Sequence, residues 1–180
     1  MTDTANTDES PSNILCKSCG LCCSGHLFAW VRLNASELAP AESLGLNVIR
    51  NDPRQRGFIQ PCPLWDGVCA AYSSPNYPRS CRKYKCIVLR RLLDEDISLP
   101  DAMSIIRDTL DLIREIEPLL PASTAISFRE RLITHKEFLE SKGKEHDLLE
   151  QEFLRKTEAL LICYEDQFGM DDFIDFEGIA

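Results

Sequence analysis

Four cysteines fall within eight residues near the start of the chain: Cys16, Cys19, Cys22 and Cys23. The first three follow a C-x2-C-x2-C spacing, and the fourth is adjacent to the third. Such spacing allows one short loop to present successive sulfur atoms to a single inorganic centre. Gly20 lies inside this run, where a backbone conformation that side chains penalise would let the loop turn around the centre.

A second block of four cysteines lies in the stretches PCPLWDGVC and CRKYKC, and consists of Cys62, Cys69, Cys81 and Cys86. We expect the two blocks to be the two halves of one site, or of two adjacent sites. The ninth cysteine, Cys163, is distant from both blocks in the sequence and is expected to be a small buried thiol.

Composition limits what these cysteines could do. The chain has 180 residues, 44% of them hydrophobic, which suits one domain with a core of ordinary size. Its net charge of -9 argues against general nucleic-acid binding, which needs a basic surface. The polar N-terminal stretch lacks the features of a secretory signal, and no apolar run has the length of a membrane span. We therefore expect a cytoplasmic protein with no membrane partner.

The expected compartment favours metal over disulfides, because disulfides rarely persist in a reducing cytosol. A second argument comes from residues 54–80, which are rich in Gly and Pro and are predicted to be irregular. So long a loop inside a compact domain needs something other than a core to order it. Metal–ligand bonds would do so.

Two chemistries remain open for the metal. An iron–sulfur cubane of the 4Fe–4S type would take three corners from Cys16, Cys19 and Cys22 and the fourth from a distant cysteine, for which the Cys62-Pro63 pair is a candidate. Zinc would take tetrahedral sets of four thiolates, and eight cysteines suffice for two ions.

Nothing outside the cysteines predicts catalysis. The chain has no phosphate-binding loop, no zincin motif and no nucleophile elbow. His26 lies near the first block and is a candidate for a further ligand, but a histidine at the start of a strand is more often a polar edge residue.

Local patterns predict the elements that would carry the cysteines. Residues 26–33 and 46–50 have the composition of short strands, separated by a short helix that Gly45 would end. Ser80 is expected to cap one helix over residues 81–93, and Cys81 in its first turn would gain thiolate character from the helix dipole.

The chain after residue 94 is expected to be helical. Ser98 and Asp101 predict a capping box with Pro100 in the first turn. Apolar residues at helical spacing predict two further helices, over residues 128–143 and 149–168, that pack as antiparallel neighbours. We thus expect an α+β fold: a small irregular cysteine-rich metal-binding module with short strands and helices, followed by an α-helical C-terminal region. Its expected segments are a disordered tail (1–13), the cysteine module (14–94), the helical region (95–169) and an acidic, aromatic tail (170–180).

The cysteine pattern resembles the CxxCxxCC cysteine-cluster family, also called YkgJ-type and described as zinc- or iron-chelating proteins. The resemblance covers residues 16–86, a little under half of the chain, and implies metal chelation by the eight clustered cysteines. One local order differs, since Pro78 precedes Arg79 where the family commonly has Arg-Pro. The matching motifs are Cys16-x2-Cys19-Gly-x-Cys22-Cys23, Pro61-Cys62-Pro63-Leu64, Cys69-x2-Tyr72, Pro78-x2-Cys81-Arg82 and Cys86.

Three functional hypotheses follow. The leading one is a cytoplasmic protein that binds an iron–sulfur cluster or zinc through the eight cysteines. The second is a cluster-dependent redox or methyl-transfer enzyme, because some relatives carry this cluster in flagellin lysine N-methylases; Cys23 would then be the spare thiol. The third is a zinc-stabilised adaptor that meets a protein partner through the basic residues Arg82, Lys83 and Lys85.

Overall fold

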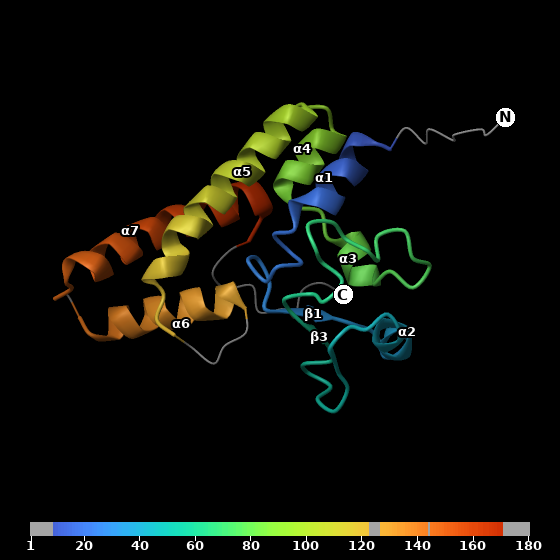
Figure 1. The fold of residues 1–180 in the computed structure, drawn as a ribbon, viewed down its shortest axis with the longest axis horizontal. Helices are drawn as coiled ribbons and strands as arrows, with labels where there is room; N and C mark the ends of the chain where they lie inside the picture. Colours follow the sequence, from blue (N-terminus) through green and yellow to red (C-terminus); the bar gives the residue numbers. More distant parts are fainter. Residues whose placement is uncertain (1–8, 123–126, 144, 171–180) are drawn as a thin grey trace.

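The computed structural model describes residues 9–122, 127–143 and 145–170. It has a body of long helices and a smaller part with a three-stranded sheet and short helices, which confirms the expected α+β class with a helical C-terminal region (Figure 1). The described elements are α1 (Pro11–Cys19), β1 (Trp30–Arg32), the 3-10 turn η1 (Ala35–Glu37), α2 (Leu38–Ser43), β2 (Val48–Ile49), β3 (Gly57–Ile59), α3 (Arg79–Lys83), α4 (Ile87–Leu93), α5 (Leu99–Ile116), the 3-10 turn η2 (Glu117–Leu119), α6 (Phe128–Ser141), α7 (Leu148–Cys163) and the π-helical turn η3 (Tyr164–Phe168).

The helical body forms where local signals predicted it. The Ser98 hydroxyl accepts a hydrogen bond from the Asp101 amide, and the Asp101 carboxylate accepts one from the Ser98 amide, so the capping box of α5 is confirmed. Ile106 and Ile113 lie on the buried face of α5, which packs against α7 and α1. The last helix ends at Gly169, in the left-handed conformation, as its sequence predicts.

The sheet has the order β1-β3-β2, and both pairs are antiparallel. Its edge strands lie within the predicted strand regions, but β3 falls in the stretch that we expected to be irregular. The expectation was wrong for these three residues, which are too few to show an alternating pattern; β3 is held by the strands on either side of it. Its Phe58 lies opposite Val31 and Val48 and is 1% exposed.

The single helix predicted over residues 81–93 is also wrong, since the chain forms α3 and α4 with a break between them. Tyr84 is extended at the break, and Cys86 caps α4 by accepting a hydrogen bond from the Leu89 amide. Ser80 does not cap a helix; its hydroxyl donates to the Arg32 carbonyl and ties α3 to β1.

Helix α1 was not predicted. Residues 11–13, assigned to the disordered tail, form its first turn, and residues 1–8 lie outside the described part. Ser10 caps the helix, proline occupies its start and Leu15 is buried against the helical body. Residues 171–180 of the expected C-terminal tail are likewise outside the described part.

Two apolar cores result, and the cysteine-bearing chain lies between them. The large core joins Leu15, Leu21, Leu27 and Phe28 to the buried faces of helices α4 to α7. The small core lies under the sheet and is formed by Leu33, Leu38, Ala41, Leu46 and Phe58.

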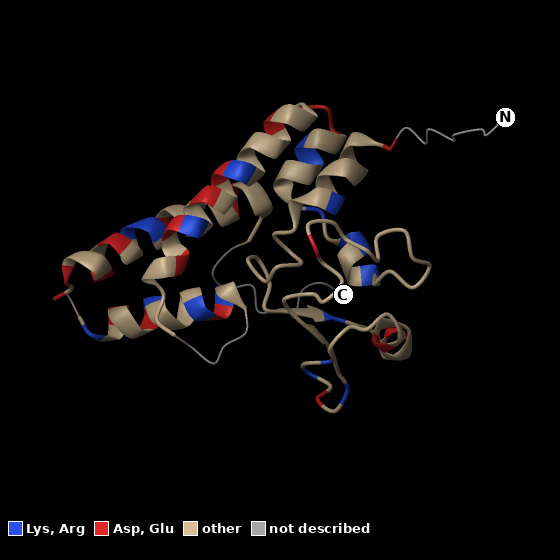
Figure 2. Cartoon of the chain, viewed as in Figure 1, with Lys and Arg blue, Asp and Glu red and all other residues tan. Residues whose placement is uncertain are grey.

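Charged residues of both signs are spread along helices α5, α6 and α7 (Figure 2). Among the described residues, no helix combines the length and the apolar character needed to cross a bilayer.

Candidate metal centre

Eight of the nine cysteines line one cavity of about 120 Å³. The sequence predicted that the two blocks come together, and the structure brings them together. The wall between the sulfur atoms is largely apolar and includes Leu15, Phe28, Phe58 and Leu89. The cysteines are Cys16, Cys19, Cys22, Cys23, Cys62, Cys69, Cys81 and Cys86.

The first block is placed by α1 and the turn that follows it. Cys16 and Cys19 are three positions apart on α1, so their side chains share a face of the helix. The helix ends at Gly20 with φ 73°, which confirms the predicted special backbone conformation. The buried side chain of Leu21 then anchors the turn that carries Cys22 and Cys23.

The second block is tied to the first by backbone hydrogen bonds. The Cys62 amide donates to the Cys23 carbonyl (2.6 Å), and the Cys69 amide donates to the Lys17 carbonyl (3.1 Å). These bonds show how residues 61–72 are held without regular structure: the first block supplies their partners.

A close approach of two segments reinforces this contact. A Cβ atom built on Gly20 would lie 2.1 Å from Cζ2 of Trp65, much closer than carbon atoms can approach. The indole therefore packs directly on the backbone at the end of α1, and only glycine leaves room for it.

Cys81 lies in α3 and Cys86 caps α4, so the break between these helices faces the cavity. Tyr84 fixes the break: its ring meets Phe28 edge to face at 4.9 Å, and its hydroxyl donates to the Phe168 carbonyl at 2.6 Å. The cavity wall is thereby linked to the π-helical turn at the end of the helical body.

Burial keeps most of these thiols neutral at pH 7. It raises the pKa of Cys16 to about 11, and that of Cys19 and of Cys81 to about 12, with repulsion from neighbouring thiolates acting in the same direction. The pKa of Cys22 is raised well above the ordinary value for the same reasons. A cation that binds here would have to displace protons from these thiols.

Cys69 is the exception. A hydrogen bond from the Cys23 thiol lowers the pKa of Cys69 to about 6, and the same bond raises the pKa of Cys23. Lys17 adds a smaller favourable charge. The expectation that the helix gives Cys81 thiolate character is wrong, because burial raises the pKa of Cys81 and outweighs the effect of the short helix around it.

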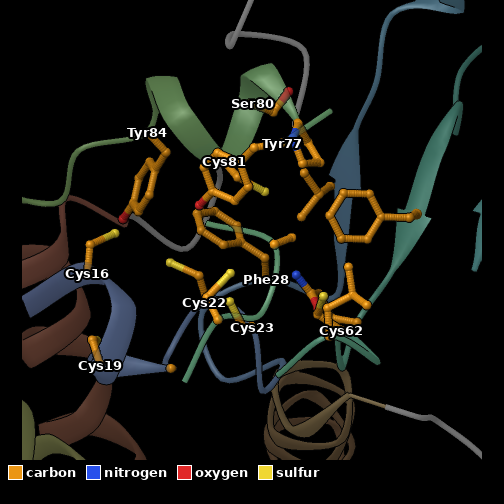
Figure 3. Close-up of a pocket in the computed structure, with 18 of the residues that line it drawn as sticks. Cys16, Cys19, Cys22, Cys23, Phe28, Cys62, Tyr77, Ser80, Cys81 and Tyr84 are labelled. Carbon is orange, nitrogen blue, oxygen red and sulfur yellow. The ribbon is translucent and has the colours of Figure 1, made fainter. Parts of the chain in front are cut away.

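The sulfur atoms surround a shared space. Cys16 and Cys19 approach it from α1, Cys62 lies on the opposite side, and Cys22 and Cys23 lie between them (Figure 3). Within the described residues, no three His, Cys, Asp or Glu side chains are already arranged to hold one ion.

Sequence reasoning missed Gln60 and the two tyrosines of the wall. The Gln60 side chain lines the cavity and is 2% exposed, yet its Oε1 accepts no hydrogen bond from the described residues. The only sequence signal for it is its position two residues before Cys62. Tyr77 and Tyr84 also line the cavity, and burial raises the pKa of both.

Two weaker candidates lie elsewhere. His26 is not among the residues that line the cavity; its Nδ1 lies 2.7 Å from Ser24 Oγ and its ring packs on Phe128. Cys163 is half-buried on α7, 3.3 Å from Thr109 Oγ1.

Comparison of the chain with protein-family models, with curated proteins and with solved structures finds no match in any of the three. The function of the chain must therefore be inferred from the cavity itself.

Proposed function

We propose that the chain is a metal-binding protein of the cytoplasm whose eight cavity cysteines hold an iron–sulfur centre, with zinc as the alternative. One observation carries the proposal: eight of nine cysteines, drawn from two distant blocks, line a single cavity. A donor set made only of thiols suits soft metals, which include zinc and the iron of iron–sulfur clusters.

The size of the cavity favours a cluster. A bare zinc ion holds its sulfur ligands about 2.3 Å away, so four thiolates close tightly around it. A single water molecule needs roughly 10–15 Å³ of such space, whereas this cavity measures about 120 Å³. An iron–sulfur cluster brings its own iron and sulfide atoms and would occupy far more of that space than two ions.

Gln60 fits the same proposal. Its carboxamide is buried in the cavity wall with an unsatisfied oxygen, which costs free energy unless something in the cavity meets the group. Rotation of the amide by half a turn would present its N–H groups to a thiolate or sulfide instead. Outer partners of this kind orient metal centres and tune their potential.

The resemblance to the CxxCxxCC family points to the same chemistry, and the enzyme and adaptor hypotheses stay predictions. The adaptor hypothesis has one supporting feature, the basic side chains of α3, where the Arg82 guanidinium lies over the Tyr77 ring at 5.5 Å.

The deciding test is the metal and acid-labile sulfide content of protein purified without oxygen, together with its visible spectrum. Iron with matching sulfide and a brown colour would support the iron–sulfur proposal. Colourless protein with tightly held zinc would support the alternative. Protein that carries no metal, and takes up none from iron and sulfide or from zinc salts, would refute metal binding.

A further inference from the structure

We infer that the eight cysteines form two four-thiolate sites, and that the adjacent residues Cys22 and Cys23 belong to different sites. The helix-side set is Cys16, Cys19, Cys22 and Cys86; the sheet-side set is Cys23, Cys62, Cys69 and Cys81. This inference rests on the proposed metal-binding function and specifies which residues share a centre.

Packing separates the two sets. Cys19, Cys22 and Cys86 pack against the large core of the helical body. Cys62 and Cys81 pack against the small core under the sheet. The cysteines that line the cavity are therefore divided between two cores, and in Figure 3 Cys19 and Cys62 lie at opposite sides of the cavity.

The chain connects the members of each set. On the helix side, α1 carries Cys16 and Cys19 and packs against α4, whose N-cap is Cys86. On the sheet side, Cys23 holds Cys62 through its carbonyl and is hydrogen-bonded to Cys69 through its thiol.

The division explains the paired cysteines. Cys22 packs against the large core, whereas the carbonyl of Cys23 accepts a hydrogen bond from the Cys62 amide, so the two adjacent residues are placed to serve different centres. A related division occurs in two-cluster ferredoxins, where the fourth cysteine of the run binds the other cluster. Cys23, considered from sequence as a spare reactive thiol, is thus a ligand of the second site.

Paired double variants test the inference, with retained metal measured after competition with a chelator. Cys19→Ala/Cys86→Ala and Cys62→Ala/Cys81→Ala each leave one set intact, and each should keep half of the wild-type metal. Cys86→Ala/Cys62→Ala breaks both sets and should keep almost none. Cys163→Ala is the matched control and should keep all of it. The division is wrong if either variant that breaks only one set loses all of its metal, or if the variant that breaks both sets keeps half of the wild-type metal.

A second measurement needs no variant. Co²⁺ added to the reduced, metal-free protein should raise the thiolate–cobalt absorbance until two equivalents are bound. Saturation at one equivalent would overturn the two-site inference while leaving metal binding intact. Wild-type protein that holds no metal and gives no cobalt absorbance would instead refute the proposed function.

Discussion

Replacing Gly20 by alanine should destabilise the protein through two separable effects. Gly20 has φ 73°, where a Cβ atom is strained in any surroundings, and here that atom would also overlap the Trp65 indole at 2.1 Å. Gly67 provides a matched control, because its φ is 71° and a Cβ atom there meets nothing within 4 Å.

The magnitudes follow from these two environments. The left-handed conformation costs an alanine about 1–2 kcal/mol, and this cost should be similar at both positions. Steric overlap in a packed region adds about 1–3 kcal/mol, at Gly20 only. We expect Gly67→Ala to lower the free energy of unfolding by about 1–2 kcal/mol and Gly20→Ala by about 2–5 kcal/mol.

Urea unfolding of the reduced, metal-free protein, followed by circular dichroism, would measure both values. A double-mutant cycle isolates the contact: in a Trp65→Ala background, the cost of Gly20→Ala should fall to that of Gly67→Ala. Equal costs at the two glycines, or a cost at Gly20 that does not depend on Trp65, would refute the packing of the indole on the end of α1.

Three further outcomes are expected. In the folded state the pKa of Cys19 and of Cys81 is about 12, above the 9.0 of an ordinary thiol. The contribution of these thiols to stability is therefore fully present below pH 9.0 and is lost as the pH rises toward 12. A melting temperature of the metal-free protein that does not fall above pH 9.0 would contradict this. Ser98→Ala should lower the free energy of unfolding by about 1 kcal/mol, because the helix cap is lost. Ser104→Ala, within the same helix, should change the free energy of unfolding by no more than about 0.5 kcal/mol. Urea unfolding measures both values. Tyr84→Phe should lower the free energy of unfolding by about 0.5–1.5 kcal/mol, because it removes the hydrogen bond from the Tyr84 hydroxyl to η3. Faster amide hydrogen exchange at residues 164–170 would show that this part of the chain is loosened. Unchanged exchange there would count against the link.

Much of the helical body could be predicted because its signals are local. The Ser98 cap, the apolar periodicity of α5 and the glycine stop at Gly169 all act within a few residues, so a single sequence contains them. The backbone conformation of Gly20 was predicted for the same reason.

The errors fall where distant partners decide. Strand β3 exists because β1 and β2 flank it, although they come from earlier segments of the chain. The break at Tyr84 is held by a bond to Phe168, far along the sequence, which no pattern around residue 84 could reveal. Helix α1 forms with Leu15 buried against the helical body.

The sequence by itself determined the chemistry available to this protein: two blocks of cysteines whose spacing predicts a shared site with sulfur donors only. The tertiary structure decided which sulfur atoms are neighbours. It places Cys22 beside the helical core and Cys23 against Cys69, and it lowers the pKa of Cys69 while burial raises the pKa of Cys81. Burial and hydrogen bonding act through space, so the spacing of residues along the chain could predict the set of cysteines but not which of them are neighbours.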